Sequence, residues 1–492
     1  MSDSPVVPRP TFHFTPLRNW MNDPNGLVHE RGRWHLFYQF NPEGPEWGNM
    51  SWGHATSTDL QHWTEHPVAL RFRDGEQIFS GSIVSTPAAD GTELTAYYTS
   101  AYADGRQAQS RATSRDGGFT WELDADNPVL DRGTSAFRDP KVIRYTDETG
   151  RLRWILLAVE AEDRQVHFYA SDDLRSWEHV SAFGPLGPSG VVWECPDLVP
   201  LPLDDDPDDV RWALILSTNP VGEEPDREGS SMSYVVGRFD GTRFTADSAE
   251  LVRLDSGRDL YAGVTFDSAP QGDAIMVGWM SNWRYAEAFP STPWKGAMSL
   301  PRQLALHTVR GRPRLVQRPP SFLLEQLTRA AQATVVVAEQ PVDLSLSGHS
   351  VLDLRWDPDT TGAVSVRLRG DADACVELEH SGRALRVTRR GPAAEAVHAD
   401  FPSTSVAEVG TGGPVQLLLS LDGPLLEIFA DHGEATVSNL VPLGLGPIVV
   451  TVGTERPGAV TYTAVDVASD ESIPDPAATP LHAPQDHPAT AL

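Results

Sequence analysis

Cysteine is scarce in this chain, which has 492 residues and only two cysteines, Cys195 and Cys375. Small secreted domains that depend on disulfides carry several paired cysteines, so the composition excludes that class of protein. The two cysteines lie in different parts of the chain, in separate expected domains. We therefore expect both to be free thiols.

Basic residues are also few. Lys and Arg total 39 against 68 Asp and Glu, which gives a formal net charge of −29. Nucleic acids and anionic membranes bind basic surfaces, so neither is expected as a partner. The chain also lacks any apolar run that approaches the ~18 residues of a membrane-spanning segment.

Residues 1–5 lack the basic region and apolar stretch of a signal peptide. The sequence therefore predicts a cytoplasmic protein, although a secreted protein without its leader would read the same way. No metal or other cofactor is expected, because the histidines near the N-terminus do not show the spaced His/Cys pattern of a zinc site. These histidines are His29, His35, His54, His62 and His66.

A repeated element, Ser-x-Asp followed within a few residues by Trp, indicates the fold. It occurs at 57–63, 114–121 and 171–177, each time after short strand-like runs. One four-stranded sheet per ~50–65 residues is typical of a β-propeller, whereas a β-sandwich would repeat its turn signals at shorter intervals. The sequence therefore predicts an all-β protein in which residues 10–318 form a five-bladed β-propeller.

The pattern of apolar residues in the sequence changes after residue 318. Residues 319–335 read as a linker with one helical stretch near 321–331, and alternating apolar residues then fill 336–468. This alternation predicts a C-terminal β-sandwich, for which structural support is the expected role. The tail 469–492 is rich in proline and has no apolar period, so we expect it to be disordered.

Three carboxylates lie within two residues of a proline, in segments that also carry an aromatic residue: Asp23, Asp139 and Glu194. Individually, Asp-Pro-Asn-Gly is an ordinary turn and Arg-Asp a common ion pair. Together they provide what a retaining glycosidase needs, an ionised nucleophile and a carboxylic acid that protonates the leaving group. Asp23 suits the first role because amide groups surround it, and Glu194 suits the second because it lies between Trp193 and Cys195.

The chain resembles glycoside hydrolase family 32, the β-fructosidases. The resemblance covers about residues 10–468 and rests on six ordered blocks in the first domain and one motif in the second. These are 20–26, 79–82, 137–140, 193–196, 278–283 and 294–302, and then 426–429 followed by 431–433.

The resemblance implies a retaining, exo-acting enzyme that hydrolyses terminal β-D-fructofuranosyl residues of levan, inulin or sucrose. It assigns Asp23 as nucleophile, Glu194 as general acid/base and Asp139 as transition-state stabiliser, with Cys195 tuning the pKa of the acid. The positions that match the fructose-binding residues are Asn22, Gln39, Trp47, Phe79, Ser80, Arg138 and Trp283.

Two alternatives remain open at this point, a fructosyltransferase on the same scaffold and a non-catalytic fructan-binding propeller. The chain departs from the family pattern at Val264, where glutamine is common, and in the acidic loop 222–233. Both departures bear on the leaving-group side. The preferred linkage, the preferred chain length and the oligomeric state are not readable from the sequence.

Overall fold

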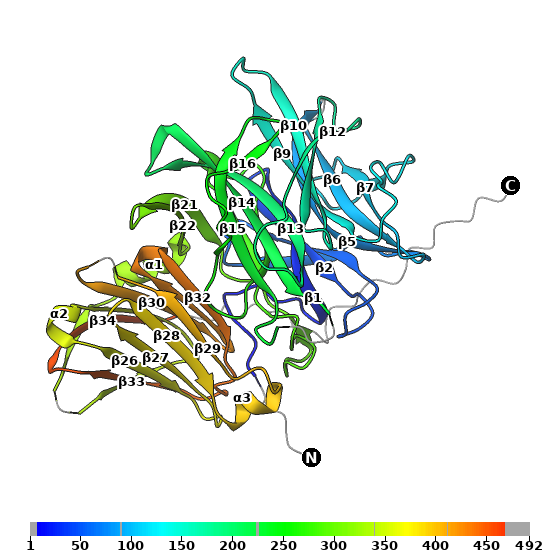
Figure 1. Cartoon of the computed structure of the whole chain (residues 1–492). Helices are drawn as coiled ribbons and strands as arrows, with labels where there is room; N and C mark the ends of the chain where they lie inside the picture. The colour runs from blue at the N-terminus through cyan, green and yellow to red at the C-terminus, as the bar shows by residue number, and fades with distance from the viewer. Residues whose placement is uncertain (1–6, 89–90, 223–225, 339, 411, 468–492) are drawn as a thin grey trace.

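The computed structural model describes residues 7–88, 91–222, 226–338, 340–410 and 412–467. The expected disordered tail, 469–492, lies outside these residues. Within them the chain is almost entirely β-structure, arranged as two bodies side by side (Figure 1). The described helices are α1 (Ser321–Arg329), α2 (Pro358–Thr361) and α3 (Pro392–Val397), with 3₁₀ turns at Pro270–Gly272 and Asp431–Gly433. None of them is long and apolar enough to cross a membrane.

The first body contains three sheets whose strands follow each other in chain order. The first sheet holds β1 (Asn19–Glu30), β2 (Arg33–Phe40), β3 (Ser51–Ser57) and β4 (Trp63–Leu70). The second holds β5 (Glu76–Ala88), β6 (Gly91–Tyr102), β7 (Gln107–Ser114) and β8 (Glu122–Leu123). The third holds β9 (Phe137–Thr146), β10 (Leu152–Glu160), β11 (Gln165–Ser171) and β12 (Glu178–Phe183).

A nine-stranded sheet completes this body, and a short strand closes it. The nine strands are β13 (Val191–Leu203), β14 (Asp206–Pro220), β15 (Ser231–Phe239), β16 (Phe244–Ala246), β17 (Val252–Arg253), β18 (Tyr261–Thr265), β19 (Ile275–Trp279), β21 (Arg302–Val309) and β22 (Arg312–Arg318). The closing strand, β20 (Trp294–Lys295), pairs in parallel with the start of β1. Late and early parts of the first body are thereby joined.

The leading strands of successive sheets contact one another in a ring. β1 contacts β5, β5 contacts β9, β9 contacts β13, β13 contacts β18, and β18 returns to β1. The first body is therefore a closed β-propeller in which the same ends of these inner strands meet.

The repeated Ser-x-Asp element forms the same turn between the outer strands of successive sheets. Asp59 Oδ1 accepts the backbone N–H groups of Gln61 and His62 at 2.9 and 2.8 Å. Asp173 Oδ1 accepts the corresponding groups of Arg175 and Ser176, both at 2.8 Å. A short acceptor that caps exposed N–H groups explains why the repeat retains Asp.

The second body is a β-sandwich of two six-stranded sheets. One contains β23 (Ala333–Val337), β34 (Gly458–Asp466), β25 (His349–Trp356), β30 (Val415–Asp422), β31 (Leu425–Ala430) and β32 (Ala435–Leu440). The other contains β24 (Val342–Leu346), β33 (Ile448–Thr454), β26 (Val364–Arg369), β27 (Cys375–Ser381), β28 (Ala384–Arg390) and β29 (Ser403–Glu408). The expected linker 319–335 is shorter than the sequence suggests, because β23 already pairs with β34 from Ala333.

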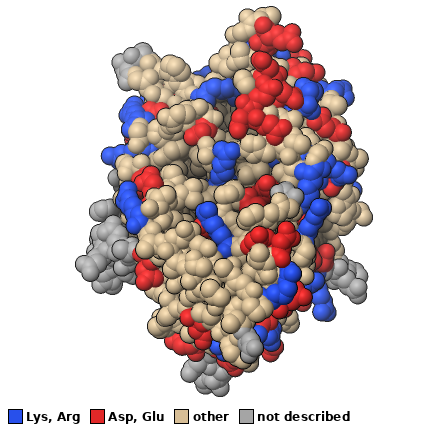
Figure 2. All heavy atoms as spheres, turned by 90° about the vertical axis from the view of Figure 1, so that its left-hand side faces the viewer, with Lys and Arg blue, Asp and Glu red and all other residues tan. Residues whose placement is uncertain are grey.

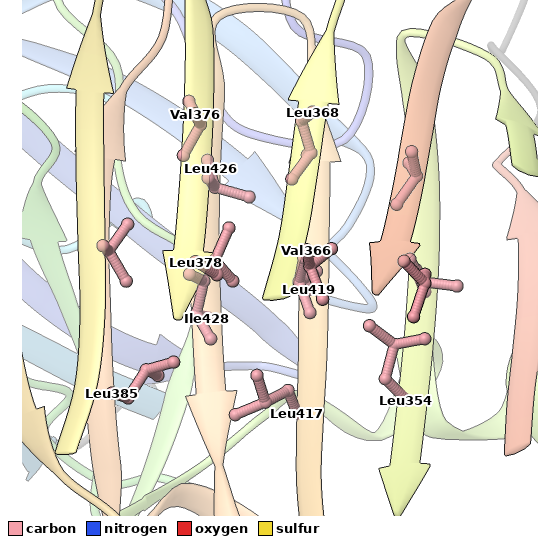
Figure 3. Packing of buried hydrophobic residues seen from close by; sticks show 14 of the residues in the cluster. Leu354, Val366, Leu368, Val376, Leu378, Leu385, Leu417, Leu419, Leu426 and Ile428 are labelled. Atoms are coloured by element: carbon pink, nitrogen blue, oxygen red, sulfur yellow. The ribbon is translucent and has the colours of Figure 1, made fainter. Parts of the chain in front are cut away.

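Alternate residues of the two sheets face each other and form the sandwich core. Leu354, Leu417 and Leu419 lie on one sheet, and Val366, Leu368 and Leu378 lie on the other (Figure 3). All six are 2% exposed or less. This is the burial that the alternating apolar pattern predicts.

On the face in Figure 2, basic side chains are interspersed with acidic ones, and the densest charged group is acidic.

A buried network of charged groups joins the two bodies. Arg302 of the propeller donates to Asp255 at 2.9 Å and, through Nε, to Glu427 of the sandwich at 3.1 Å. His13 lies between Asp422 Oδ2 at 2.8 Å and Glu427 Oε1 at 2.9 Å. Because each buried charge has a partner of opposite sign, separating the bodies would leave unpaired charges.

The pH dependence of His13 provides a test of this network. Burial alone lowers the pKa of His13, but Asp422 and Glu427 outweigh it and raise the pKa to about 9. The contribution of His13 to stability should be fully present below its unfolded pKa of about 6.5 and lost as the pH rises through about 9. We expect His13→Gln to lower the free energy of unfolding in urea by on the order of 3 kcal/mol near pH 6, and by much less near pH 10. An equal difference at both pH values would contradict the assignment.

Candidate active site

The three carboxylates singled out in the sequence come together at one end of the propeller. Asp23 lies on β1, Asp139 on β9 and Glu194 on β13, each near the beginning of its strand. These strands belong to the ring of inner strands, so residues far apart in the sequence become neighbours. Asp23 and Asp139 are 8% and 6% exposed.

Each inner strand is interrupted by a bulge or irregularity close to the level of these residues. A β-bulge disrupts the pairing of a strand locally and re-aims a side chain. Proline has no N–H to pair, so the prolines that follow Asp23, Asp139 and Cys195 are tolerated there. In chain order, β1, β5, β9, β13 and β18 are interrupted within the ranges 21–24, 79–81, 138–141, 194–197 and 261–264.

Asp23 is held through one of its two oxygens. Ser80 Oγ donates to Asp23 Oδ2 at 2.7 Å, whereas Oδ1 is buried and has no hydrogen-bond partner among the described residues. Burial raises the pKa of Asp23, and the charge of Glu194 acts in the same direction, while hydrogen bonds from Ser80 and Asn22 oppose it. Oδ1 is therefore the oxygen left available for chemistry.

Asp139 has a strained backbone and a buried carboxylate. Its φ is +62°, and its N–H donates to Thr99 Oγ1 at 2.9 Å. Burial raises the pKa of Asp139 to about 7, although Arg138 opposes the shift. A side chain other than glycine at positive φ persists only where surrounding contacts hold it, and such residues concentrate at functional sites.

Glu194 is the most accessible of the three, with a side chain 20% exposed. Arg138 donates to Glu194 Oε1 through Nε at 3.2 Å and through Nη2 at 3.0 Å. The hydroxyl of Tyr261 donates to the other oxygen, Oε2. The sequence did not single out Tyr261, although it lies three residues before Val264, which marks a departure from the family pattern.

The role expected of Cys195, tuning the pKa of Glu194, stays a prediction, and its side chain contacts the other two carboxylates. Its thiol lies 3.6 Å from Asp23 Oδ2 and 3.7 Å from Asp139 Oδ2, and its N–H donates to Asp139 at 2.9 Å. The side-chain contacts to Glu194 come from Arg138 and Tyr261 instead. Cys195 has a φ of +47° within the β13 bulge, which turns its side chain toward the other two carboxylates.

Aromatic side chains and amides line the same end of the propeller. Trp283 stacks on Trp20 with ring centroids 6.0 Å apart, and Trp47, 42% exposed, meets the edge of Phe79 at 5.9 Å. The two amides expected to bind fructose, those of Asn22 and Gln39, each form a hydrogen bond within the protein. Asn22 Oδ1 accepts from Trp20 Nε1 at 2.8 Å, and Gln39 Nε2 donates to the carbonyl of Ile78 at 3.1 Å.

Among the described residues, no group of three or more His, Cys, Asp or Glu side chains is arranged to hold a metal ion. The carboxylates of the site offer acid–base and nucleophilic chemistry, with aromatic faces beside them. This combination suits a polyhydroxylated ring, because apolar faces bind its carbon framework while carboxylates and amides bind its hydroxyl groups.

Comparisons with known proteins agree with this chemistry. A family model described as "Glycosyl hydrolases family 32 N-terminal domain" matches residues 13–319. An extracellular exo-inulinase of Aspergillus awamori is 35% identical, covering 87% of this chain and 88% of the relative. A levanase of Bacillus subtilis is 36% identical over 88% of this chain and 66% of its own length. The crystal structure of the A. awamori exo-inulinase superposes with a TM-score of 0.86 at 32% identity, covering 94% of this chain and 98% of the other.

The comparison overturns the expected location. The N-terminal residues predict a cytoplasmic protein, because they show no signal peptide, but the A. awamori relative is named as extracellular. This finding contradicts the expected cytoplasmic location. The residues at the start of a chain are a poor guide, because a leader leaves no trace in the folded domains.

The two cysteines should differ sharply in reactivity. Burial raises the pKa of the Cys195 thiol well above its ordinary value, and the neighbouring carboxylates add to the shift, whereas Cys375 is only partly buried. Since the thiolate is the reactive form, we expect a disulfide reagent to modify one thiol per native chain and two after unfolding. In Cys375→Ser the native reaction should disappear. Two reactive thiols in the native wild type would contradict this description of Cys195.

Proposed function

The chain belongs to glycoside hydrolase family 32, and we propose that it is an exo-acting β-fructosidase that retains the configuration of the sugar. Its substrates would be the terminal β-D-fructofuranosyl residues of fructans or sucrose. The relatives named exo-inulinase and levanase support this substrate class. The observation that carries the proposal is the convergence of Asp23, Asp139 and Glu194 at one end of the inner strands.

In the first step Asp23 Oδ1 would attack the anomeric carbon of the terminal fructose. This oxygen is buried and unpartnered among the described residues, while Ser80 fixes the other oxygen of the carboxylate. Glu194 would protonate the leaving oxygen as the glycosidic bond breaks. Its greater exposure suits a group that must face the leaving part of the substrate.

In the second step Glu194 would deprotonate a water that releases fructose from Asp23. Arg138 and Tyr261 hold the two oxygens of Glu194, so the same group would remain oriented for both proton transfers. Asp139 would bind hydroxyl groups of the ring and stabilise the positive charge of the transition state. These steps call for no metal or other cofactor.

The terminal fructose would be recognised by the residues around these carboxylates. Trp47, Phe79 and Trp283 would contribute apolar surfaces. Ser80 and Arg138 already contact the catalytic carboxylates, and Asn22 and Gln39 would use the remaining hydrogen-bonding capacity of their amides.

We also propose five blades for the propeller, with the nine-stranded sheet divided between the last two. The ring formed by β1, β5, β9, β13 and β18 supports this count, since each would be the inner strand of one blade. The proposed domains are a catalytic propeller over 10–318, a linker and a sandwich. The pairing of β23 with β34 supports a sandwich that begins at Ala333 rather than at 336.

Substitution of the two reacting carboxylates tests the roles. We expect Asp23→Asn to lower turnover by about 10⁴-fold or more, and Glu194→Gln by about 10²–10⁴-fold. Because burial disfavours the charged form of Asp23, the Asn variant should unfold at a temperature no lower than the wild type. Asp126→Asn, which alters an exposed carboxylate elsewhere in the propeller, is the matched control. Turnover near that of the wild type in either active-site variant would refute the assignment.

The products formed over time test the activity itself. Inulin, levan and sucrose would each be incubated with the enzyme and the products separated by size. An exo-hydrolase should release free fructose from the polymers without shorter oligosaccharides at early times. Oligosaccharides released early would indicate an endo-acting site, longer products from concentrated sucrose would indicate a fructosyltransferase, and no product from any substrate would leave a binding propeller.

A further inference from the structure

A hollow of about 460 Å³ lies beside the candidate active site, at the same end of the propeller. It is formed by the segment that leads into β5, the end of β6 and the start of β7, and we call it the β5–β6 groove. Its volume falls within the ~300–1,000 Å³ typical of ligand sites. The groove lies at the start of β5 and the end of β6, close in the chain to Ser80. Ser80 is the residue that donates a hydrogen bond to Asp23.

The groove adjoins the catalytic residues at two points. Phe79 lines it, precedes Ser80 in the chain and contacts the exposed Trp47. Gln107 also lines it and accepts a hydrogen bond from Arg138 Nη1 at 3.4 Å. Arg138 in turn holds Glu194, so the groove lies on the side of the group proposed to protonate the leaving oxygen.

Two further aromatic side chains line the groove, Phe72 and Tyr102, and both are partly exposed. The guanidinium of Arg106 covers one face of Tyr102, with its carbon 4.4 Å from the ring centroid, and that of Arg71 covers Phe72 at 5.1 Å. An arginine on one face of each ring holds that ring in place, and the ring remains partly exposed to solvent. Each ring therefore offers a rigid apolar surface to a ligand, and its side chain loses little conformational entropy when the ligand binds.

The polar groups of the groove suit a neutral ligand. Arg73 and Glu76 pair with each other at 2.5 Å, so their charges are largely satisfied within the protein. The exposed Asp74 is the remaining charged residue of the lining. Gly75 and Gly105 face open space, since a Cβ atom on either would meet nothing within 4 Å. Asn49 and Gln107 add amide groups that can bind hydroxyls. Aromatic faces with amides at the edge are the lining that a carbohydrate chain requires.

We propose that the β5–β6 groove binds the fructosyl units of a fructan that lie beyond the cleaved linkage. The inference rests on the proposed function and deepens it by naming the chain-length class of the substrate. Sucrose, which has only one sugar beyond its fructose, would not reach Phe72 and Tyr102. Longer fructans would gain binding from both rings.

The test compares substrates of increasing length, namely sucrose, 1-kestose and inulin, on Tyr102→Ala, Phe72→Ala and the matched control Tyr102→Phe. We expect each Ala variant to lower kcat/KM on inulin by about threefold to tenfold. The loss should appear in KM with kcat unchanged, because the groove would bind the ground state and transition state equally. Values on sucrose should stay within about twofold of the wild type, and Tyr102→Phe should retain the preference for inulin.

The possible outcomes distinguish failure of the proposed groove from failure of the proposed function. Equal loss on sucrose and inulin would mean that the rings support the fold or the catalytic residues, and would overturn the groove. Unchanged activity of both Ala variants on inulin would overturn it as well. If the wild type hydrolyses none of the three substrates, the proposed function itself fails. Hydrolysis of all three with no dependence on Tyr102 or Phe72 would leave that function intact and remove only the groove.

Discussion

The alignment of irregularities in the inner strands is the constraint on which the site depends. A strand in unbroken register sends consecutive side chains to opposite faces, so neighbouring residues such as Arg138 and Asp139 could not readily serve one site. The bulges relax this alternation close to one level of the ring. Asp139 and Cys195 take positive φ angles there, and the surrounding sheets hold them in place.

The constraint has an electrostatic cost that the surrounding residues partly offset. Burial raises the pKa of both Asp23 and Asp139, which shows that the protein opposes their ionisation. Arg138, Ser80 and the N–H of Cys195 supply the compensating charge and hydrogen bonds. Placing these donors on different sheets makes the arrangement depend on the whole propeller rather than on any one loop.

Much of this organisation could be predicted from the sequence, because it is encoded locally. The strands around Trp34, Trp154 and Val366 follow from apolar patterns, and the Ser-x-Asp turns follow from capping chemistry. Prolines close to Asp23, Asp139 and Glu194 marked the three strands that carry these carboxylates, and the structure supplies the reason, since proline is tolerated at a bulge. The contacts of Tyr261 and the direction of the Cys195 thiol depend on backbone dihedrals at the bulges, which residue types do not specify.

The parallel pairing of β20 with β1 sets the order in which the protein can assemble during synthesis. β1 carries Asp23 and is among the first segments to leave the ribosome, yet its partner, Trp294–Lys295, emerges much later. Arg302 cannot form its ion pair with Glu427 until that residue, still further along the chain, has been synthesised. Domains generally fold as units as they are synthesised. Here β1 cannot gain its parallel partner until Trp294 and Lys295 have been made, and the propeller cannot gain its buried ion pair with the sandwich until Glu427 has been made.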